Sequence, residues 1–135
     1  MTWQYFKQKA PNLAASGEQM LDRAGLVLLG TLRKDGFPRI SPVEPLFADG
    51  QLYLGMMWRS RKASDLLRDP RCTVHSPTSN RDGSEGDFKV YGRAVEIQDL
   101  DSRQRYCEEM YEKIGWKPEE LEFHLFSIDV ESAAL

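Results

Sequence analysis

The sequence predicts a mainly β fold, a closed or nearly closed antiparallel barrel of six strands with two to three peripheral helices. Two observations predict it. Most neighbouring segments of strand length are joined by short turns, including two Asp-Gly turns typical of hairpins. Few segments have the apolar spacing of a helix. We expect closure because an open sheet of this size would expose two unpaired edges.

The composition is that of an ordinary globular protein, with 41% hydrophobic and 29% charged residues among 135. This length suits one domain, residues 1–135. A net charge of −3 argues against a nucleic-acid partner. No apolar run approaches the roughly 20 residues that span a bilayer, and no signal-peptide core begins the chain, so we expect a cytoplasmic protein without membrane contact. Cys72 and Cys107 are expected to be reduced, partly buried thiols.

The first half of the chain is expected to begin with a helix over residues 16–24. Ser16 and Gln19 fit a capping box, and Gly25 ends the apolar stripe. Two Asp-Gly turns then divide the next segment into three strands, at residues 26–32, 37–47 and 51–57.

The second half should begin with a short helix over residues 60–68 and a strand over 71–75. Residues 76–86 are polar and contain glycine, which predicts an exposed loop. In the strand expected over 87–97, Gly92 indicates a bulge or a close approach to the backbone. The last elements are a helix that Asp101 caps and Gly115 ends, and a strand over 123–130.

The helix over residues 60–68 begins with an unusual charge pattern. Arg61 and Lys62 lie in its first turn, where aligned peptide dipoles already place about half a positive charge. Both cations can simply point outward, with Arg61 pairing with Asp65 for about 0.3–0.5 kcal/mol. Alternatively, free N–H groups, the Ser60 hydroxyl and both cations converge on one anion site that suits a phosphate.

Common catalytic motifs do not occur in the sequence. It contains no Walker loop, Gly-x-Gly-x-x-Gly or Gly-x-Ser-x-Gly, so nucleotide hydrolysis and acylation have no local support. His75 and His124 have no metal-ligand spacing, and we expect structural histidines and no metal site. Trp58 is expected in the core or at an interface. The sequence identifies no catalytic residue.

Four short motifs together resemble the pyridoxamine 5′-phosphate oxidase-like family. They are TLxxDGxPxISPV from residue 31, LYL from residue 52, SRKAxDLxRDPR from residue 60 and VxGRA from residue 90. The resemblance covers roughly residues 25–97 and is most specific at the Ser-Arg-Lys motif. It implies a split β-barrel, six-stranded and antiparallel, that forms a homodimer with cofactor grooves at the interface.

The resemblance also implies a cofactor, which is flavin mononucleotide (FMN) or the deazaflavin coenzyme F-420. In the family, the Arg and Lys at this helix start hold the cofactor phosphate, which assigns that role to Arg61 and Lys62. The other residues implied to bind the cofactor are Arg39, Ser41 and Val43 on one face of the second strand, Gly55 and Met56 at the end of the third, and Ser60.

Three departures from the vitamin-B6 enzymes of the family indicate a different substrate. Those enzymes have a lysine where this chain has Glu44, a glutamine where it has Asp87, and a C-terminal segment that carries residues for the substrate phosphate. We therefore do not expect a true oxidase that forms pyridoxal phosphate. Pro42 and Pro45 remove two backbone donors, which predicts an edge or a bulge near the groove.

Two functions of different classes follow from these observations. The first is an oxidoreductase, dependent on a flavin or deazaflavin, that transfers a hydride to a small organic substrate. The second is a non-catalytic module that binds or senses a flavin, haem or another ligand on the same barrel, because a fold does not determine a function.

Overall fold

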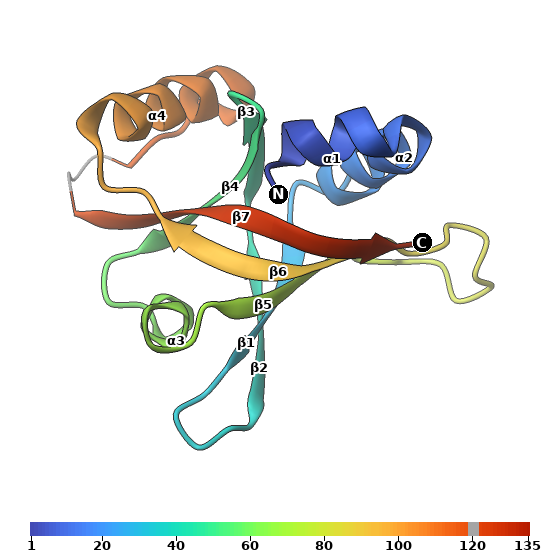
Figure 1. The fold of residues 1–135 in the computed structure, drawn as a ribbon, viewed down its shortest axis with the longest axis horizontal. Coiled ribbons are helices and arrows are strands. Elements are labelled where there is room, and N and C mark those ends of the chain that lie inside the picture. The colour runs from blue at the N-terminus through green and yellow to red at the C-terminus, as the bar shows by residue number, and fades with distance from the viewer. Residues whose placement is uncertain (119–121) are drawn as a thin grey trace.

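The computed structural model describes residues 1–118 and 122–135, in which it contains seven strands and four helices (Figure 1). In chain order they are α1 (Trp3–Lys9), α2 (Pro11–Asp22), β1 (Val27–Leu32), β2 (Pro38–Val43), β3 (Pro45–Ala48), β4 (Gln51–Met57), α3 (Arg61–Arg68), β5 (Arg71–His75), β6 (Lys89–Glu96), α4 (Leu100–Ile114) and β7 (Phe123–Ala134). The mainly β, antiparallel fold is confirmed, with one more strand than expected and four helices in place of two to three.

The strand order β2-β1-β5-β6-β7-β4-β3 explains how the sheet closes. Each strand pairs antiparallel with its neighbours. β2 and β3 form the two edges of the sheet, yet only Glu44 separates them in the chain. The two edges therefore meet at this residue, and the sheet curls into a half-barrel.

The expectation of one strand over residues 37–47 is wrong because the chain changes edge within it. β2 pairs with β1, whereas β3 pairs with β4. Pro42 lies in β2 and Pro45 begins β3, so both prolines occupy edge strands, where a missing N–H is tolerated. The predicted edge position is confirmed.

The first helices begin earlier than the sequence suggested. α2 starts at Pro11, and the expected cap at Ser16 is wrong, because Ser16 lies inside the helix. Proline suits the first helical position, where its missing N–H removes no intrahelical bond. Gly17 is buried against the ring of Phe88, and a Cβ there would lie 2.3 Å from it.

α4 also begins earlier than expected, after Asp99 rather than Asp101. The carboxylate of Asp99 accepts a hydrogen bond from the Ser102 N–H at 3.0 Å. Gly115 ends the helix as predicted, in the left-handed conformation with φ 71°. Tyr106 of this helix is buried against the sheet.

Strand β6 carries the predicted irregularity at its glycine. The register with β7 shifts between Tyr91 and Gly92, and a Cβ on Gly92 would lie 2.1 Å from the carbonyl oxygen of Asp129. The close neighbour is therefore the β7 backbone and not a ligand. The predicted loop is also confirmed: residues 76–88 form no helix or strand and project at the end opposite α4 (Figure 1).

Two apolar clusters stabilise the barrel. The larger fills its interior and includes Trp3 and Phe6, so the aromatic N-terminal segment belongs to the core. The smaller cluster lies under α4 and consists of Leu46, Tyr53, Tyr106, Met110, Phe123 and Leu125. Within the described residues, every helix is too short or too polar to cross a lipid bilayer.

Candidate cofactor-binding site

The start of α3 has the cap that the sequence predicts. Ser60 precedes the helix, and its hydroxyl accepts a hydrogen bond from the Ala63 N–H at 3.4 Å. Arg61 is exposed and Lys62 is half-buried. Neither forms an ion pair with any residue that the structure describes, so two uncompensated cations stand at the positive end of the helix dipole.

The pairing of Arg61 with Asp65 suggested by their spacing does not form. The buried carboxylate of Asp65 instead accepts hydrogen bonds from Arg39 at 2.7 Å, from the Thr31 hydroxyl at 2.8 Å and from Arg68 at 3.2 Å. Burial alone would raise the pKa of Asp65, but these three donors outweigh it and lower the pKa below its ordinary value. Asp65 therefore stays ionised and holds Arg39 against α3.

An apolar cleft of about 610 Å³ opens on one side of the α3 start. Its lining comes from the residue before β1, the end of β2 and its junction with β3, the end of β4 and the residue after it, α3, α4 and the residues after it, and the start of β7. The lining residues are Leu26, Pro42, Val43, Glu44, Gly55, Met56, Met57, Trp58, Lys62, Tyr106, Trp116, Pro118, Glu122 and Phe123. The volume and the mostly apolar lining are typical of a site for a flat organic ligand.

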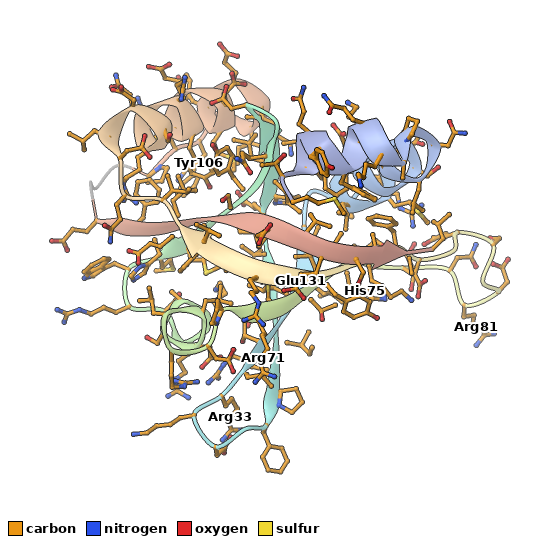
Figure 2. All side chains as sticks on the ribbon, viewed as in Figure 1. Arg33, Arg71, His75, Arg81, Tyr106 and Glu131 are labelled. Atoms are coloured by element: carbon orange, nitrogen blue, oxygen red, sulfur yellow. The ribbon has the colours of Figure 1, made fainter. Side chains whose placement is uncertain are left out.

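A cationic hollow of about 450 Å³ opens on the other side, between α3 and the β1–β2 hairpin. Its lining residues are Arg33, Lys34, Asp35, Arg39, Arg61, Ser64, Asp65 and Arg68. Five cations and two carboxylates thus surround this space, which favours an anionic ligand. Figure 2 shows Arg33 at the hairpin end of the molecule and Tyr106 at the α4 end.

The residues expected to bind a cofactor divide between these two spaces. Val43, Gly55, Met56 and Lys62 line the apolar cleft, whereas Arg39 and Arg61 line the cationic hollow. Ser60 caps α3 between them, and Ser41 lies on β2 between Val43 and Arg39 without lining either space.

Arg61 and Lys62 line different spaces, one on each side of the α3 start. Successive helical residues point about 100° apart, so the two side chains face different spaces. Along β2, Val43 and Arg39 are four residues apart, which corresponds to about 13 Å. The site is therefore elongated, with an apolar end, a cationic end and the start of α3 in the middle.

Several lining residues were not identified from the sequence as ligand-binding residues. Tyr106 comes from α4, and Trp116 follows that helix. Their positions depend on how α4 packs against β3 and β4, and no sequence motif marks them. Glu44 was noted only as a departure from a family pattern, yet it lines the apolar cleft.

Trp58 lies at the rim of the apolar cleft rather than in the core. It is 47% exposed, and its ring stacks on His124 at 4.5 Å between centroids. The Nε2 atom of His124 accepts a hydrogen bond from the Arg59 N–H at 3.2 Å. His124 therefore supports the turn that leads into α3, in agreement with its expected structural role.

Comparison with protein-family models gives one match. The model described as pyridoxamine 5′-phosphate oxidase matches residues 14–135, which is most of the chain. A search of the curated proteins found no match.

Solved structures share the fold at low sequence identity. A conserved hypothetical protein of Mycobacterium tuberculosis superposes with a TM-score of 0.75 and 19% identity, over 88% of this chain and 81% of that one. The haem storage protein HutZ of Vibrio cholerae gives 0.73 and 14%, over 93% of both chains. A candidate pyridoxamine 5′-phosphate oxidase of Listeria innocua gives 0.69 and 17%, over 96% of both.

Proposed function

Because the chain belongs to the pyridoxamine 5′-phosphate oxidase family, we propose that it is an oxidoreductase that binds FMN or the deazaflavin coenzyme F-420 in the elongated site. The observation that carries the proposal is the Arg61–Lys62 start of α3, set between an apolar cleft and a cationic hollow and without an ion pair to any described residue. Both cofactors combine a flat ring with a phosphate on a flexible chain. The apolar cleft suits the ring, and the cationic start of α3 suits the phosphate.

The phosphate end of the ligand is assigned to the start of α3. Free backbone N–H groups there point out of the helix, and Arg61 and Lys62 lie on either side. Arg39 adds a third cation, fixed by its 2.7 Å hydrogen bond to Asp65. A phosphate would turn the unfavourable clustering of positive charge into charge-assisted hydrogen bonds.

The ring end is assigned to the apolar cleft. Val43, Gly55 and Met56 form its wall on the sheet side, and Trp58 and Trp116 stand at its edge. Glu44, which replaces a lysine of the vitamin-B6 enzymes, lies here rather than in the cationic hollow. Glu44 is thus five residues along the chain from Arg39 and does not line the cationic hollow.

The bound cofactor supplies the redox chemistry, since its ring accepts and returns a hydride, which no protein side chain can do. The protein contributes binding, orientation and exclusion of water. We propose that the substrate is a small apolar or conjugated molecule, because the rim of the apolar cleft exposes Leu26, Met57, Trp58 and Trp116. We assign no side chain as a proton donor or acceptor in the reaction.

We propose a homodimer that forms through the outer face of the sheet. Ile40 of β2, Gly30 of β1, Thr73 of β5 and Tyr91 of β6 pair in one row across four strands. Ile40 and Tyr91 are 66% and 44% exposed, which is unusual for large apolar side chains on a sheet. The next row contains Pro42, which also lines the apolar cleft, so a second copy on this face would border the site.

The second candidate is a ligand-binding module without turnover. It is favoured by the similarity of the fold to the haem storage protein of Vibrio cholerae and to a haem binding protein of Mycobacterium smegmatis, with TM-scores of 0.73 and 0.63. Among the described lining residues of the apolar cleft there is no histidine, the usual axial ligand of haem iron.

The experiment is a titration of the purified protein with FMN, coenzyme F-420 and haem, followed by redox cycling. We expect saturable binding of FMN or F-420, reduction of the bound cofactor, and its reoxidation by an organic acceptor such as a quinone. Tight binding of haem alone, or of a flavin that does not cycle, would support the binding module instead. No binding of any of the three would overturn the oxidoreductase and would also exclude a module for a flavin or haem.

A further inference from the structure

Tyr106 of α4 is held rigidly at the wall of the apolar cleft. Only 3% of the residue is exposed. Its ring packs against those of Tyr53 and Phe123, with centroid distances of 6.3 and 5.8 Å. Figure 2 shows the side chain between α4 and the sheet. The direction of its hydroxyl is therefore fixed by packing on both sides.

Gly55 of β4 provides the space for that hydroxyl. A Cβ atom on Gly55 would lie 2.1 Å from the Tyr106 oxygen, far closer than two such atoms can approach. Gly55 lies in a regular stretch of β4, paired with Leu125 of β7, and its φ is not in the left-handed region. The strand therefore needs glycine here for space and not for backbone conformation.

No hydrogen bond joins the Tyr106 hydroxyl to a residue that the structure describes, and Tyr106 and Gly55 both line the apolar cleft. Every fully buried side-chain nitrogen or oxygen among the described residues has a hydrogen-bond partner, so the unpaired Tyr106 hydroxyl keeps access to the cleft. Tyr53, in the same cluster, does not line the cleft. The Tyr106 O–H is thus free to bind a ligand in the cleft.

The protonation state of Tyr106 makes this group a donor. Burial raises its pKa above the ordinary value, and the nearby carboxylate of Glu44 raises it further. The phenol is therefore neutral throughout the physiological range. Because Glu44 also disfavours an anion at this end, the matching ligand atom is an uncharged acceptor, such as a carbonyl oxygen.

We propose that Tyr106 donates a hydrogen bond to a carbonyl oxygen on the pyrimidine edge of the cofactor ring, an inference that rests on the proposed flavin or deazaflavin function. Both ring systems carry carbonyl oxygens on this edge. The Gly55–Tyr106 pair thus recognises the ring, whereas Arg61 and Lys62 recognise the phosphate. Different side chains therefore bind the ring end and the phosphate end of the ligand.

The test compares FMN with riboflavin, which has the same ring and no phosphate. In Tyr106→Phe we expect both ligands to bind about 5- to 10-fold more weakly, as for loss of one neutral hydrogen bond, so that the ratio of the two affinities is unchanged. The absorption spectrum of bound flavin should also shift relative to the wild type. If the protein prefers the deazaflavin, the same comparison is made with F-420 and its phosphate-free ring.

The matched control is Tyr53→Phe, which removes a hydroxyl from the same apolar cluster but not from the cleft wall. We expect wild-type affinity and an unshifted spectrum for this variant. Thermal melting shows that both variants fold. Equal ring affinity in Tyr106→Phe and the wild type would overturn the role of Tyr106 and leave the proposed function standing. Failure of the wild type to bind either ring would overturn both.

Discussion

His124 is a buried imidazole that supports the approach to α3. It stacks beneath the ring of Trp58 and accepts a hydrogen bond from the N–H of Arg59, whose φ of 61° is rare outside glycine. Burial lowers the pKa of His124; Glu96 opposes this shift and Arg103 adds to it. Only the neutral ring can accept this hydrogen bond, because a protonated Nε2 would place its own N–H against the N–H of Arg59.

The stability of the protein should therefore depend on pH through His124. Its pKa in the unfolded chain is about 6.5 and is lower in the fold, so the unfolded chain binds more protons as the pH falls below about 6.5. We expect the free energy of unfolding to fall over this interval and to level off below the folded pKa. Urea unfolding between about pH 7.5 and about pH 5 measures the effect.

The control is His124→Gln, in which the side-chain oxygen can still accept from Arg59 but does not titrate. The difference in unfolding free energy between the wild type and this variant should shrink as the pH falls. A difference that is constant with pH would contradict the assigned role of His124.

Asp65 illustrates what residue patterns can and cannot predict. Its place on a short helix followed from the sequence, and so did Arg61 as its partner at i, i+4. The observed partners Thr31 and Arg39 come from β1 and β2, more than 25 residues away in sequence. Their approach depends on the packing of α3 against the sheet, which local spacing does not encode.

α3 is the element on which the cofactor assignment depends most, and its cap offers a sharp test. Asp is as good an N-cap as Ser, and its charge would favour the helix dipole and the cations Arg61 and Lys62. We expect Ser60→Asp to keep the unfolding free energy or raise it by about 0.5–1 kcal/mol. The same carboxylate should repel a phosphate, so FMN affinity should fall about 10-fold or more while riboflavin affinity is retained.

Ser60→Asn is the matched control, because it caps the helix without a charge. It should retain both stability and FMN affinity, which chemical denaturation and calorimetric titration measure. If Ser60→Asp binds FMN as tightly as Ser60→Asn does, the phosphate does not lie at the start of α3.

Strand positions were predicted better than strand partners. Alternating apolar residues and Asp-Gly turns located most strands, and the glycine in β6 marked a real bulge. The division between β2 and β3 was not predicted, because the sequence of residues 37–47 is compatible with one continuous strand. Pro42 and Pro45 indicated the edges, but only the closed sheet shows that one residue, Glu44, connects opposite edges.

For the whole molecule, the exposed apolar row on the outer sheet face predicts a dimer that one substitution can dissociate. The side chain of Ile40 covers Gly30 and is 66% exposed. We expect the wild type to sediment as a dimer and Ile40→Lys to sediment as a monomer, because a second copy would bury an unpaired charge. FMN affinity should fall with dissociation if the groove is completed by the partner.

Leu100→Lys is the control for this change, since Leu100 is 78% exposed on α4, away from the β1–β2 hairpin (Figure 1). It should remain dimeric. A monomeric wild type, or a dimeric Ile40→Lys variant, would contradict the assigned interface.

As with the fold, only part of the candidate site could be predicted from the sequence. The cationic start of α3 and the second-strand residues followed from the sequence and from a family resemblance. The apolar cleft did not, because Tyr106, Trp116 and Glu44 reach it from α4, the segment after α4 and the edge junction. Only tertiary packing brings these segments together, and their spacing in the chain carries no recognisable period.

Whether the start of α3 holds the phosphate of a ring cofactor is measured by the ratio of FMN to riboflavin affinity. The wild type should prefer FMN, and Arg61→Ala or Lys62→Ala should each lose about 1–3 kcal/mol of FMN binding while riboflavin binding is unchanged. The ratio should therefore fall about 5- to 150-fold in each variant. An unchanged ratio in both variants would show that the start of α3 does not hold the phosphate.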